Sequence, residues 1–468
     1  MRILRCLFIV LFLLPGLTLC VRDKDQKNLI IDESDQTESI ISSLKIDSVW
    51  AGHPVGFCLL SDGDRQYIAY YNAERRMVVG QRNLNDKGFS LHEMVPTYRE
   101  TSGGTSTVLG WDSHNSVILA VDKDGFIHLS GNMHVHPLTY FKSTEPFDIT
   151  TLEQVWSMTG TNENRCTYPR FAKTREGELL FHYRDGSSGS GNEIYNIYSC
   201  ETKQWSRLLD TPLTDGKGLM NAYQSEPTIM SDGWYHVYWV WRDDPDCSTN
   251  HDLSYMKSPD LKSWYNADGK PVTLPATIDD KSIIVDPIPV KGGIINLAAK
   301  LCLDEKNNPY FAYHKYDLNG NLQFYVASIV DKMWVSKKVT DWDYRWEFSG
   351  GGSINVEVRL NDFRKRGDGY FELSYWHIKY GSGTLLLNDK FEICGIVKKP
   401  GSFTSTIEKE GTFPGLEIRT AGDIGKPEEQ GVRYALKWET LPANRDRARP
   451  EPWPGPSQLY LYKLKINF

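Results

Sequence analysis

The feature that most constrains this chain is a repeated strand–turn–strand pattern, with almost no helical period after Val49. Runs rich in β-branched and aromatic residues alternate with Asp, Asn and Gly turns, and a tryptophan recurs late in several units. The paired runs are Gln66–Tyr71 with Met77–Gln81, Ser116–Val121 with Gly125–Leu129, Leu179–Tyr183 with Glu193–Tyr198, Trp234–Trp241 with Leu253–Met256, Tyr310–Tyr313 with Leu322–Val326, and Tyr370–Trp376 with Gly383–Leu387. Short strands at this spacing predict an all-β sandwich, barrel or propeller.

Two local features favour the propeller. Ser258–Trp264 resembles a degraded Asp-box, the turn of sialidase-type propeller blades. The alternating segment Gln458–Phe468 predicts a C-terminal strand, which can close a ring by pairing within an N-terminal blade. Dividing the mature length by six or seven units gives roughly 60–70 residues each, more than the ~40–50 of simple blades. Long loops are therefore expected, and loops on one face are where a site is built.

The N-terminus predicts export. Arg2 and Arg5 precede the apolar run Leu7–Leu14, which is too short to span a bilayer. We expect a signal peptide over residues 1–20, in which Cys20 either carries a lipid anchor or is incidental to ordinary cleavage. We further expect a flexible leader over residues 21–45 and a single catalytic domain over residues 46–468. The predicted location is the periplasm or, as a lipoprotein, the outer membrane of a Gram-negative bacterium.

Charge and cysteines restrict the partners. The net charge of −7 argues against binding to nucleic acid, so an acidic substrate needs a local group of cations. The six cysteines after residue 20 contain no Cys-x-x-Cys pair, and buried free thiols are expected for most of them. They are Cys58, Cys166, Cys200, Cys247, Cys302 and Cys394.

The groups that carry chemistry are concentrated between Trp111 and Arg184. Imidazole, phenol and guanidinium groups together can move a proton beside a carboxylate, which points to an enzyme for an acidic sugar. His114 lies in a turn, where it is either functional or simply exposed. Tyr168 precedes Pro169, which predicts an extended backbone at the tyrosine.

Metal sites are a second interpretation of two segments. His134 and His136 are spaced i, i+2 and would share one face of a strand, either around a metal or with one ring catalytic and the other structural. The segment Asp243–Asp252 offers hard oxygen donors, one imidazole and one thiol, which suit calcium or zinc, although a polar loop connecting two blades is the favoured interpretation. Gly186–Gly191 is followed by no Lys-Ser/Thr and no helix, so nucleotide binding is not expected.

Several of these segments together resemble a known group. They are Gly131–Leu138, Thr167–Arg170, Tyr183–Gly186, Trp241–Asp243 and Thr249–Asp252. They are similar to the BNR-repeat-containing proteins, which include seven-bladed propeller polysaccharide lyases such as ulvan lyases and L-rhamnose-α-1,4-D-glucuronate lyases of arabinogalactan. The resemblance covers residues 50–400. It implies a single seven-bladed propeller with long loops on the active-site face.

The resemblance also implies the site. His114, His134, Tyr168 and Arg184 match the positions of catalytic residues, and Tyr223, His136, Arg242 and Asn132 are expected to bind substrate. The implied reaction is β-elimination at a 4-linked uronate, which needs no cofactor, although a structural calcium or zinc ion is compatible with it. Arg184 would neutralise the carboxylate. His114 and Tyr168 would carry the proton transfers, with Arg184 lowering the pKa of Tyr168.

The expected protein is a monomeric polysaccharide lyase that binds an acidic polysaccharide. Cleavage of rhamnose–glucuronate linkages in arabinogalactan is the favoured function, and ulvan lyase is the alternative. Two other classes stay open. A sialidase-like glycoside hydrolase would use either two carboxylates, with Asp112, Asp185 and Glu226 as candidates, or a Tyr/Glu nucleophile with an arginine triad. A non-catalytic glycan-binding propeller would use the abundant aromatic residues.

Overall fold

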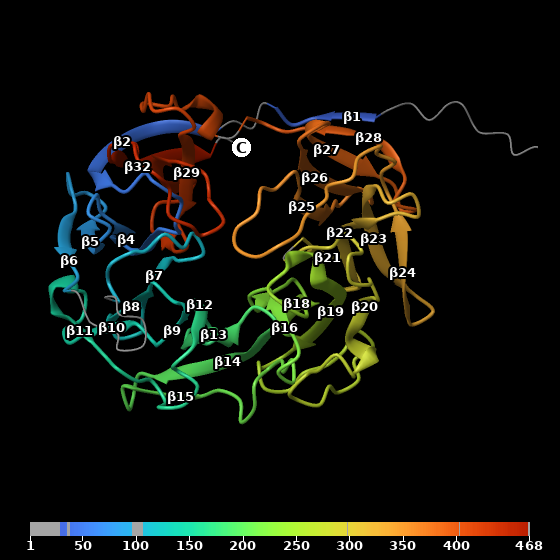
Figure 1. Ribbon diagram of the computed structural model, residues 1–468, viewed down its shortest axis with the longest axis horizontal. Helices are drawn as coiled ribbons and strands as arrows, with labels where there is room; N and C mark the ends of the chain where they lie inside the picture. Colours follow the sequence, from blue (N-terminus) through green and yellow to red (C-terminus); the bar gives the residue numbers. More distant parts are fainter. Residues whose placement is uncertain (1–28, 35–37, 96–105, 297, 402, 467–468) are drawn as a thin grey trace, which may run out of the picture.

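The computed structural model describes residues 29–34, 38–95, 106–296, 298–401 and 403–466 (Figure 1). The signal peptide and the anchor at Cys20 that the sequence predicts lie outside these residues. The described part is all-β, with strands throughout and four short 3-10 helices. It contains no helix long and apolar enough to cross a membrane. The 3-10 helices are η1 (Ile149–Thr151), η2 (Cys247–Thr249), η3 (Lys281–Ile283) and η4 (Phe403–Thr406).

The strands of the first half of the chain form three sheets. The first contains β3 (Cys58–Gly63), β4 (Arg65–Tyr71), β5 (Met77–Asn83), β6 (Ser90–Glu93) and β30 (Lys426–Pro427). The second contains β7 (Val117–Val121), β8 (Ile127–Gly131), β10 (Tyr140–Ser143) and β11 (Leu152–Gln154). The third has ten strands: β9 (His134–His136), β12 (Cys166–Lys173), β13 (Leu179–Ser187), β14 (Ser190–Ser199), β15 (Gln204–Arg207), β16 (Asn221–Gln224), β17 (Thr228–Ile229), β18 (Tyr235–Arg242), β19 (Asn250–Ser258) and β20 (Ile284–Asp286).

Three further sheets complete the described fold. The fourth contains β21 (Lys300–Leu303), β22 (Pro309–Tyr316), β23 (Leu322–Val330) and β24 (Met333–Lys338). The fifth contains β1 (Leu29–Asp32), β25 (Val358–Lys365), β26 (Phe371–His377), β27 (Gly381–Leu387) and β28 (Ile393–Lys398). The sixth contains β2 (Glu38–Val49), β29 (Glu417–Gly422), β31 (Val432–Thr440) and β32 (Ser457–Ile466). The sheets follow one another in chain order around a common centre (Figure 1).

All six predicted hairpins are present as antiparallel pairs: β4 with β5, β7 with β8, β13 with β14, β18 with β19, β22 with β23, and β26 with β27. The Asp-box-like turn is also formed, since the Asp260 carboxylate accepts hydrogen bonds from the backbone N–H groups of Lys262 and Ser263 and Trp264 is buried after it. No disulfide joins these six cysteines to one another, and five of them are buried and Cys200 is half-buried, as expected.

The expectation of a flexible leader over residues 21–45 is wrong for its described part. β1 pairs in parallel with β28, and β2 pairs antiparallel with β32 along its length. The segment is polar because much of β2 faces solvent, but strand pairing satisfies its backbone regardless of side-chain type. The C-terminal strand thus pairs with a strand from the N-terminal region, as the alternation of residues 458–468 predicts.

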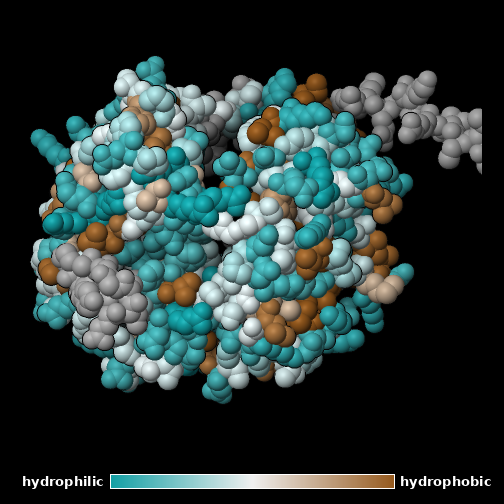
Figure 2. All heavy atoms as spheres, viewed as in Figure 1, coloured by the Kyte–Doolittle hydropathy of each residue, from teal (hydrophilic) through white to brown (hydrophobic). Residues whose placement is uncertain are grey.

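The hydrophobic core lies between neighbouring sheets. The largest cluster of buried residues joins Ile68 of β4, Leu129 of β8 and Leu436 of β31, so it unites the first two sheets with the last one. Other clusters fill the spaces between successive sheets further along the chain. Burial of apolar side chains between facing sheets therefore fixes how the units are arranged. The face seen in Figure 2 is mostly hydrophilic, with hydrophobic residues in small scattered groups.

Candidate active site

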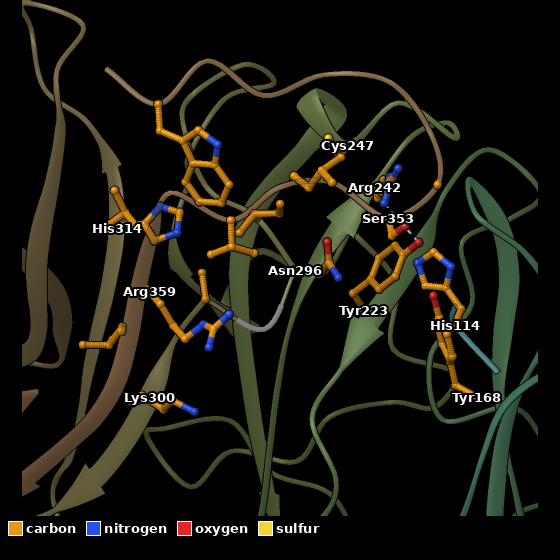
Figure 3. A pocket seen from close by; sticks show the side chains of 18 residues that line it. His114, Tyr168, Tyr223, Arg242, Cys247, Asn296, Lys300, His314, Ser353 and Arg359 are labelled. Atoms are coloured by element: carbon orange, nitrogen blue, oxygen red, sulfur yellow. Dashed lines mark hydrogen bonds between the residues drawn. The ribbon is translucent and has the colours of Figure 1, made fainter. Parts of the chain in front are cut away.

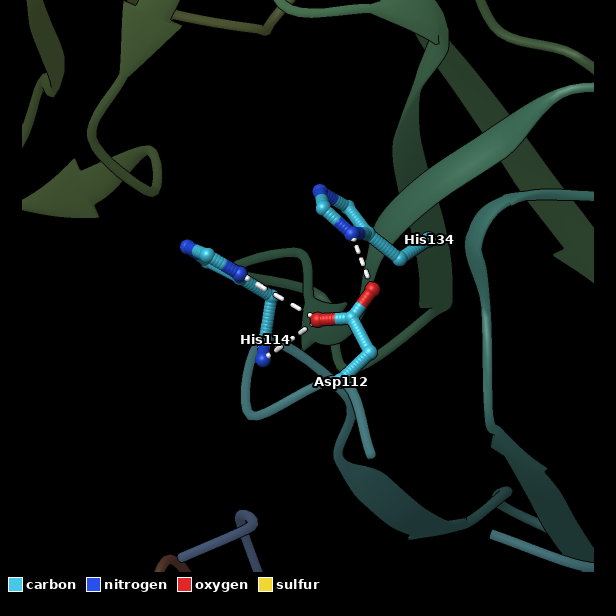
Figure 4. A group of neighbouring side chains, drawn as sticks. All are labelled: Asp112, His114 and His134. Carbon is cyan, nitrogen blue, oxygen red and sulfur yellow. Dashed lines mark hydrogen bonds and ion pairs between the residues drawn. The ribbon is translucent and has the colours of Figure 1, made fainter. Parts of the chain in front are cut away.

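The first part of the site is a cluster of two imidazoles and two carboxylates, of which Figure 4 shows His114, His134 and Asp112. Asp112 accepts hydrogen bonds from Nδ1 of His134 at 2.5 Å, from Nδ1 of His114 at 3.2 Å and from the His114 backbone N–H at 2.9 Å. Asp446 comes from the loop between β31 and β32, and its Oδ2 lies 2.9 Å from Nδ1 of His114. The two imidazole rings are stacked with 4.8 Å between their centroids. The loop before β7 and the start of β9 are thereby held together.

The carboxylates control the charge of His114. Burial alone would lower the pKa of His114, but its hydrogen bonds to Asp112 and Asp446 raise that pKa to about 9. The same contacts outweigh burial at the acids, so the pKa of Asp446 falls to about 2 and that of Asp112 falls well below its usual range. His114 is therefore an imidazolium at neutral pH, which can donate a proton but cannot act as a base.

Tyr168 is presented by an irregularity in β12. The pairing of β12 with β13 shifts between Thr167 and Arg170, and the Tyr168 φ angle is 55° in the bulge. The expectation of an extended backbone at Tyr168 is wrong, because the bulge overrides the preference set by Pro169. The ring stacks on His134 at 5.4 Å between centroids. A left-handed backbone at a tyrosine is costly and is typical of a functional position.

Tyr223 of β16 receives several hydrogen-bond donors. Its hydroxyl lies 3.1 Å from Nη1 of Arg242, at the end of β18, and 2.9 Å from Oγ of Ser188, in the turn after β13. The guanidinium carbons of Arg184 and Arg242 each lie 5.2 Å from the centroid of the Tyr223 ring. Arg184 is also 5.1 Å from the Tyr168 ring, so its guanidinium sits between the two tyrosines.

The two tyrosines have opposite electrostatic environments. Burial would raise the pKa of Tyr223, but the positive charges of Arg184 and Arg242 and the hydrogen bond with Ser188 bring it below its usual value. Burial dominates at Tyr168 and raises its pKa well above the usual range, despite the nearby Arg184. The expectation that Arg184 lowers the pKa of Tyr168 is therefore wrong. Tyr223 is the tyrosine whose phenolate is stabilised.

Arg184 is more deeply placed than the sequence suggests. Its side chain is 2% exposed, and its Nη2 is buried with no hydrogen-bond partner among the described residues. It faces Glu193 across the β13–β14 pair, and burial raises the pKa of Glu193 to about 7 although Arg184 opposes that shift. The guanidinium thus lies under the two tyrosines as a buried cation with an unused donor.

These residues meet at a pocket of about 410 Å³ (Figure 3). Its lining includes four residues predicted from the sequence: His114, Tyr168, Tyr223 and Arg242. Several polar residues that the sequence gave no reason to select also line it: Asn296, Lys300, His314, Ser353 and Arg359. No Asp or Glu is among the described residues of this lining. Lys300 and Arg359 belong to ordinary strands with no motif around them, so sequence reasoning could not find them.

The other predicted residues support the pocket from outside its lining. His134 holds Asp112 and stacks on Tyr168. The His134 backbone N–H donates to Nδ1 of His136 at 3.4 Å. Asn132 is buried and its amide donates to the backbone oxygens of residues 106 and 108, so it orders the preceding loop. Substrate contact by Asn132 and His136 stays a prediction.

The metal interpretations lead to a different set of residues. Within the described chain, the group with ligand atoms close enough for a metal ion is Asp112, His114 and His134, whose atoms lie within 4.8 Å of one another. His136 is not part of it. In the 243–252 segment, His251 lies between two carboxylates, 2.9 Å from Asp243 and 2.8 Å from Asp252. Ordinary hydrogen bonds therefore account for both clusters.

Comparison with known proteins gives a family match and two kinds of relative. The model of the BNR repeat-containing family matches residues 65–342. The short isoform of ulvan lyase from Alteromonas sp. (strain LOR) is 26% identical over 280 residues, which are 47% of this chain and 52% of that protein. The long isoform of ulvan lyase from Glaciecola sp. (strain KUL10) is 26% identical over 190 residues, 32% of this chain and 18% of that protein. The chain thus spans about half the length of the first relative.

Two solved structures share the fold over nearly all of the chain. The crystal structure of polysaccharide lyase Uly1 has a TM-score of 0.55 at 14% identity and covers 94% of this chain and 96% of that chain. A PL25 ulvan lyase bound to -[GlcA(1-4)Rha3S]- has a TM-score of 0.54 at 14% identity and covers 88% of this chain and 94% of that chain. At this identity the likeness concerns the fold alone.

Proposed function

The chain belongs to the BNR repeat-containing family, and from this premise we propose that it is a polysaccharide lyase that cleaves a uronate polymer by β-elimination. The observation that carries the proposal is the composition of the pocket. A phenol with a lowered pKa, an imidazolium and an arginine line one end of it. Elimination next to a carboxylate needs these three kinds of group.

Ulvan is the substrate we favour. The sequence alone points first to rhamnose–glucuronate linkages of arabinogalactan, with ulvan as the alternative. The comparisons support the alternative better, because the relatives are named ulvan lyases and a PL25 ulvan lyase of the same fold is bound to -[GlcA(1-4)Rha3S]-. The names of the relatives given above do not mention arabinogalactan. The bond broken is then the one between C4 of a glucuronate and its O4 substituent.

We interpret the fold as a seven-bladed propeller. The two halves of the ten-stranded sheet are joined only where β14 pairs with β16. This strand pairing consists of one residue pair, Gly191 with Asn221. Dividing the sheet there gives two units of about the size of the other five sheets. Seven units around one centre agree with the arrangement in Figure 1.

We assign the proton transfers to His114 and Tyr223. Tyr223 as phenolate takes the proton from C5, the C5–H electrons form the C4=C5 double bond, and the C4–O4 bond breaks. His114 as imidazolium gives a proton to the departing O4. Tyr168 keeps its proton because its pKa is raised, so it can donate a hydrogen bond but is a poor base. This assignment moves the base from Tyr168 to Tyr223.

The carboxylate of the sugar must be neutralised before C5 loses its proton. Arg242 lines the pocket, although its three nitrogens already donate to Tyr223 and to backbone oxygens of residues 244 and 245. Arg184 keeps Nη2 free beneath the tyrosines. We propose that both guanidinium groups supply the positive field and that Arg242 is the one in reach of the carboxylate.

The form of the hydrolase alternative that uses two carboxylates is less favoured. A glycosidase of the usual kind requires two carboxylates across the scissile bond, yet the described lining of the pocket contains none. Asp112 is bound by two histidines, Asp185 accepts a hydrogen bond from Asn162, and Glu226 pairs with Arg170 at the surface. None of these three candidates lines the pocket.

The test is incubation of the purified protein with ulvan and with gum arabic side by side. Ultraviolet absorbance reports the 4,5-unsaturated uronate, and sugar analysis reports freed rhamnose. We expect absorbance to rise with ulvan. Saturated products from both polymers would contradict elimination, whereas absorbance with gum arabic alone would restore the arabinogalactan alternative.

Export to the periplasm or outer membrane, as the N-terminal sequence suggests, remains part of the proposal. Export suits the proposed activity because a polysaccharide such as ulvan is encountered outside the cell. A monomer is expected because one pocket gathers all the proposed groups from a single chain.

A further inference from the structure

The pocket has a second end that the proposed chemistry does not use. Lys300, at the start of β21, and Arg359, on β25, lie across the pocket from Tyr223 and His114 (Figure 3). Both side chains point toward the middle of the cavity (Figure 3). β21 and β25 belong to different sheets. Two neighbouring units of the fold therefore each bring one cation to the same wall.

These two cations have no carboxylate to balance them. Within the described residues, neither side chain takes part in an ion pair, and the described lining contains no Asp or Glu although the whole chain carries a net charge of −7. His314 nearby adds no charge at neutral pH, because burial lowers its pKa to about 4. Unpaired cations of like charge in a shared cavity repel each other, and an anion between them removes that repulsion.

The groups of this end suit an acidic sugar. A guanidinium and an ammonium can share the oxygens of one anionic group, the first by two parallel hydrogen bonds and the second as a point charge. Asn296 lies between this end and Tyr223, and its amide can bind a ring hydroxyl (Figure 3). Ile354 and the exposed Val356 in the lining offer apolar surface for a ring face.

We propose that Lys300 and Arg359 form a subsite for a second anionic group of the same polysaccharide, on a sugar next to the uronate that reacts. The inference rests on the proposed function and deepens it, because it requires a substrate with two acidic groups close together. The group is an oxyanion on a sugar, either a sulfate ester or the carboxylate of another uronate. The subsite contributes to binding and takes no part in proton transfer.

Binding of polymer to the double variant Lys300→Gln/Arg359→Gln tests the proposal. Lys306→Gln/Lys390→Gln is the matched control, because it also loses two positive charges and both lysines are exposed in turns, between β21 and β22 and between β27 and β28, outside the pocket. Affinity electrophoresis in gels containing ulvan, chemically desulfated ulvan or unsulfated polyglucuronate gives the dissociation constants. We expect the double variant to bind ulvan at least about tenfold more weakly than wild type and to depend less on salt. The control should match wild type.

The polymers distinguish the two sources of the anion. If desulfation weakens wild type but not the double variant, the subsite binds a sulfate ester. If the double variant still binds more weakly than wild type to desulfated ulvan and to polyglucuronate, the subsite binds a carboxylate. Equal binding of all polymers by wild type and double variant would overturn the proposal. Because the readout is binding, a wild type that binds but forms no unsaturated uronate would refute the lyase function separately.

Discussion

At the scale of single residues, the chemistry depends on which tyrosine loses its proton. Tyr223 has two guanidinium groups and a hydroxyl around its oxygen, whereas at the half-buried Tyr168 desolvation outweighs the nearby positive charges. We expect Tyr223→Phe to lower kcat about 10²–10⁴-fold, the contribution of a positioned base. Steady-state rates on ulvan measure it, with circular dichroism to verify the fold. Near wild-type turnover in this variant, with a larger loss in Tyr168→Phe, would return the role of base to Tyr168.

The buried guanidinium of Arg184 also acts through Tyr223. Removal of its charge by Arg184→Gln should raise the pKa of Tyr223, because the charge now lowers it. The ascending limb of the pH–rate profile then moves to higher pH, and kcat at neutral pH falls. The glutamine keeps most of the side-chain volume under the two rings, so the protein should remain folded. An unchanged profile would show that Arg184 serves packing alone.

At the scale of elements, the loop between β31 and β32 belongs to the site. Asp446 of this loop accepts hydrogen bonds from the Ser113 backbone N–H at 3.1 Å and the Ser353 backbone N–H at 3.1 Å, besides its contact with His114. The loop therefore ties together the segments before β7 and before β25. Its carboxylate is one of two that keep His114 protonated.

The pH dependence of the reaction follows from this contact. The pKa of His114 is raised to about 9, so its imidazolium stays protonated below that pH. Above that pH His114 loses its proton and can no longer act as the acid. We expect the rate to fall as pH rises through about 9, and Asp446→Asn to move that fall to lower pH by removing one stabilising charge. pH–rate profiles of kcat measure both. Asp389→Asn, at an exposed site outside the pocket, is the control, and identical descending limbs in all three proteins would contradict the assignment.

Sequence reasoning succeeded where a signal is local and failed where it is not. The hairpins were predictable because runs of aromatic and β-branched residues stand on both sides of a short turn, as in β4 and β5. His114 and Tyr223 were selected as positions that the family resemblance implies, and both line the pocket. β2 was missed because its polar residues face solvent and its order comes from pairing with β32. Two features arise from tertiary contacts that no local pattern reveals. They are the bulge at Tyr168 and the contact of Asp446 with His114, which lies 332 positions earlier in the chain.

At the scale of the whole molecule, β2 from the first fifty residues and β32 from the last twelve are joined in one sheet. Leu461 of β32 is 2% exposed and lies opposite Leu44 of β2 and Leu436 of β31. We expect Leu461→Ala to reduce the free energy of unfolding by about 2–5 kcal/mol, through lost burial and the cavity that remains. Leu91→Ala on β6, where the side chain is 43% exposed, should cost less than about 1 kcal/mol.

Guanidinium denaturation followed by tryptophan fluorescence measures both changes. Since the cluster around Leu461 includes residues of the first two sheets, the midpoint should fall for the whole molecule in a single transition. A separate early transition limited to the last sheet would show that the terminal strand is not coupled to the rest of the fold.

The central claim is that the phenol, imidazolium and guanidinium groups of this pocket remove a proton from a uronate and expel its O4 substituent. The most direct measurement is the proton NMR spectrum of ulvan digested by the wild-type protein, with the Tyr223→Phe variant beside it. The account predicts a vinyl proton of a 4,5-unsaturated uronate at the new non-reducing ends, formed by the wild type and nearly absent with the variant. New ends that carry only saturated uronate would contradict it.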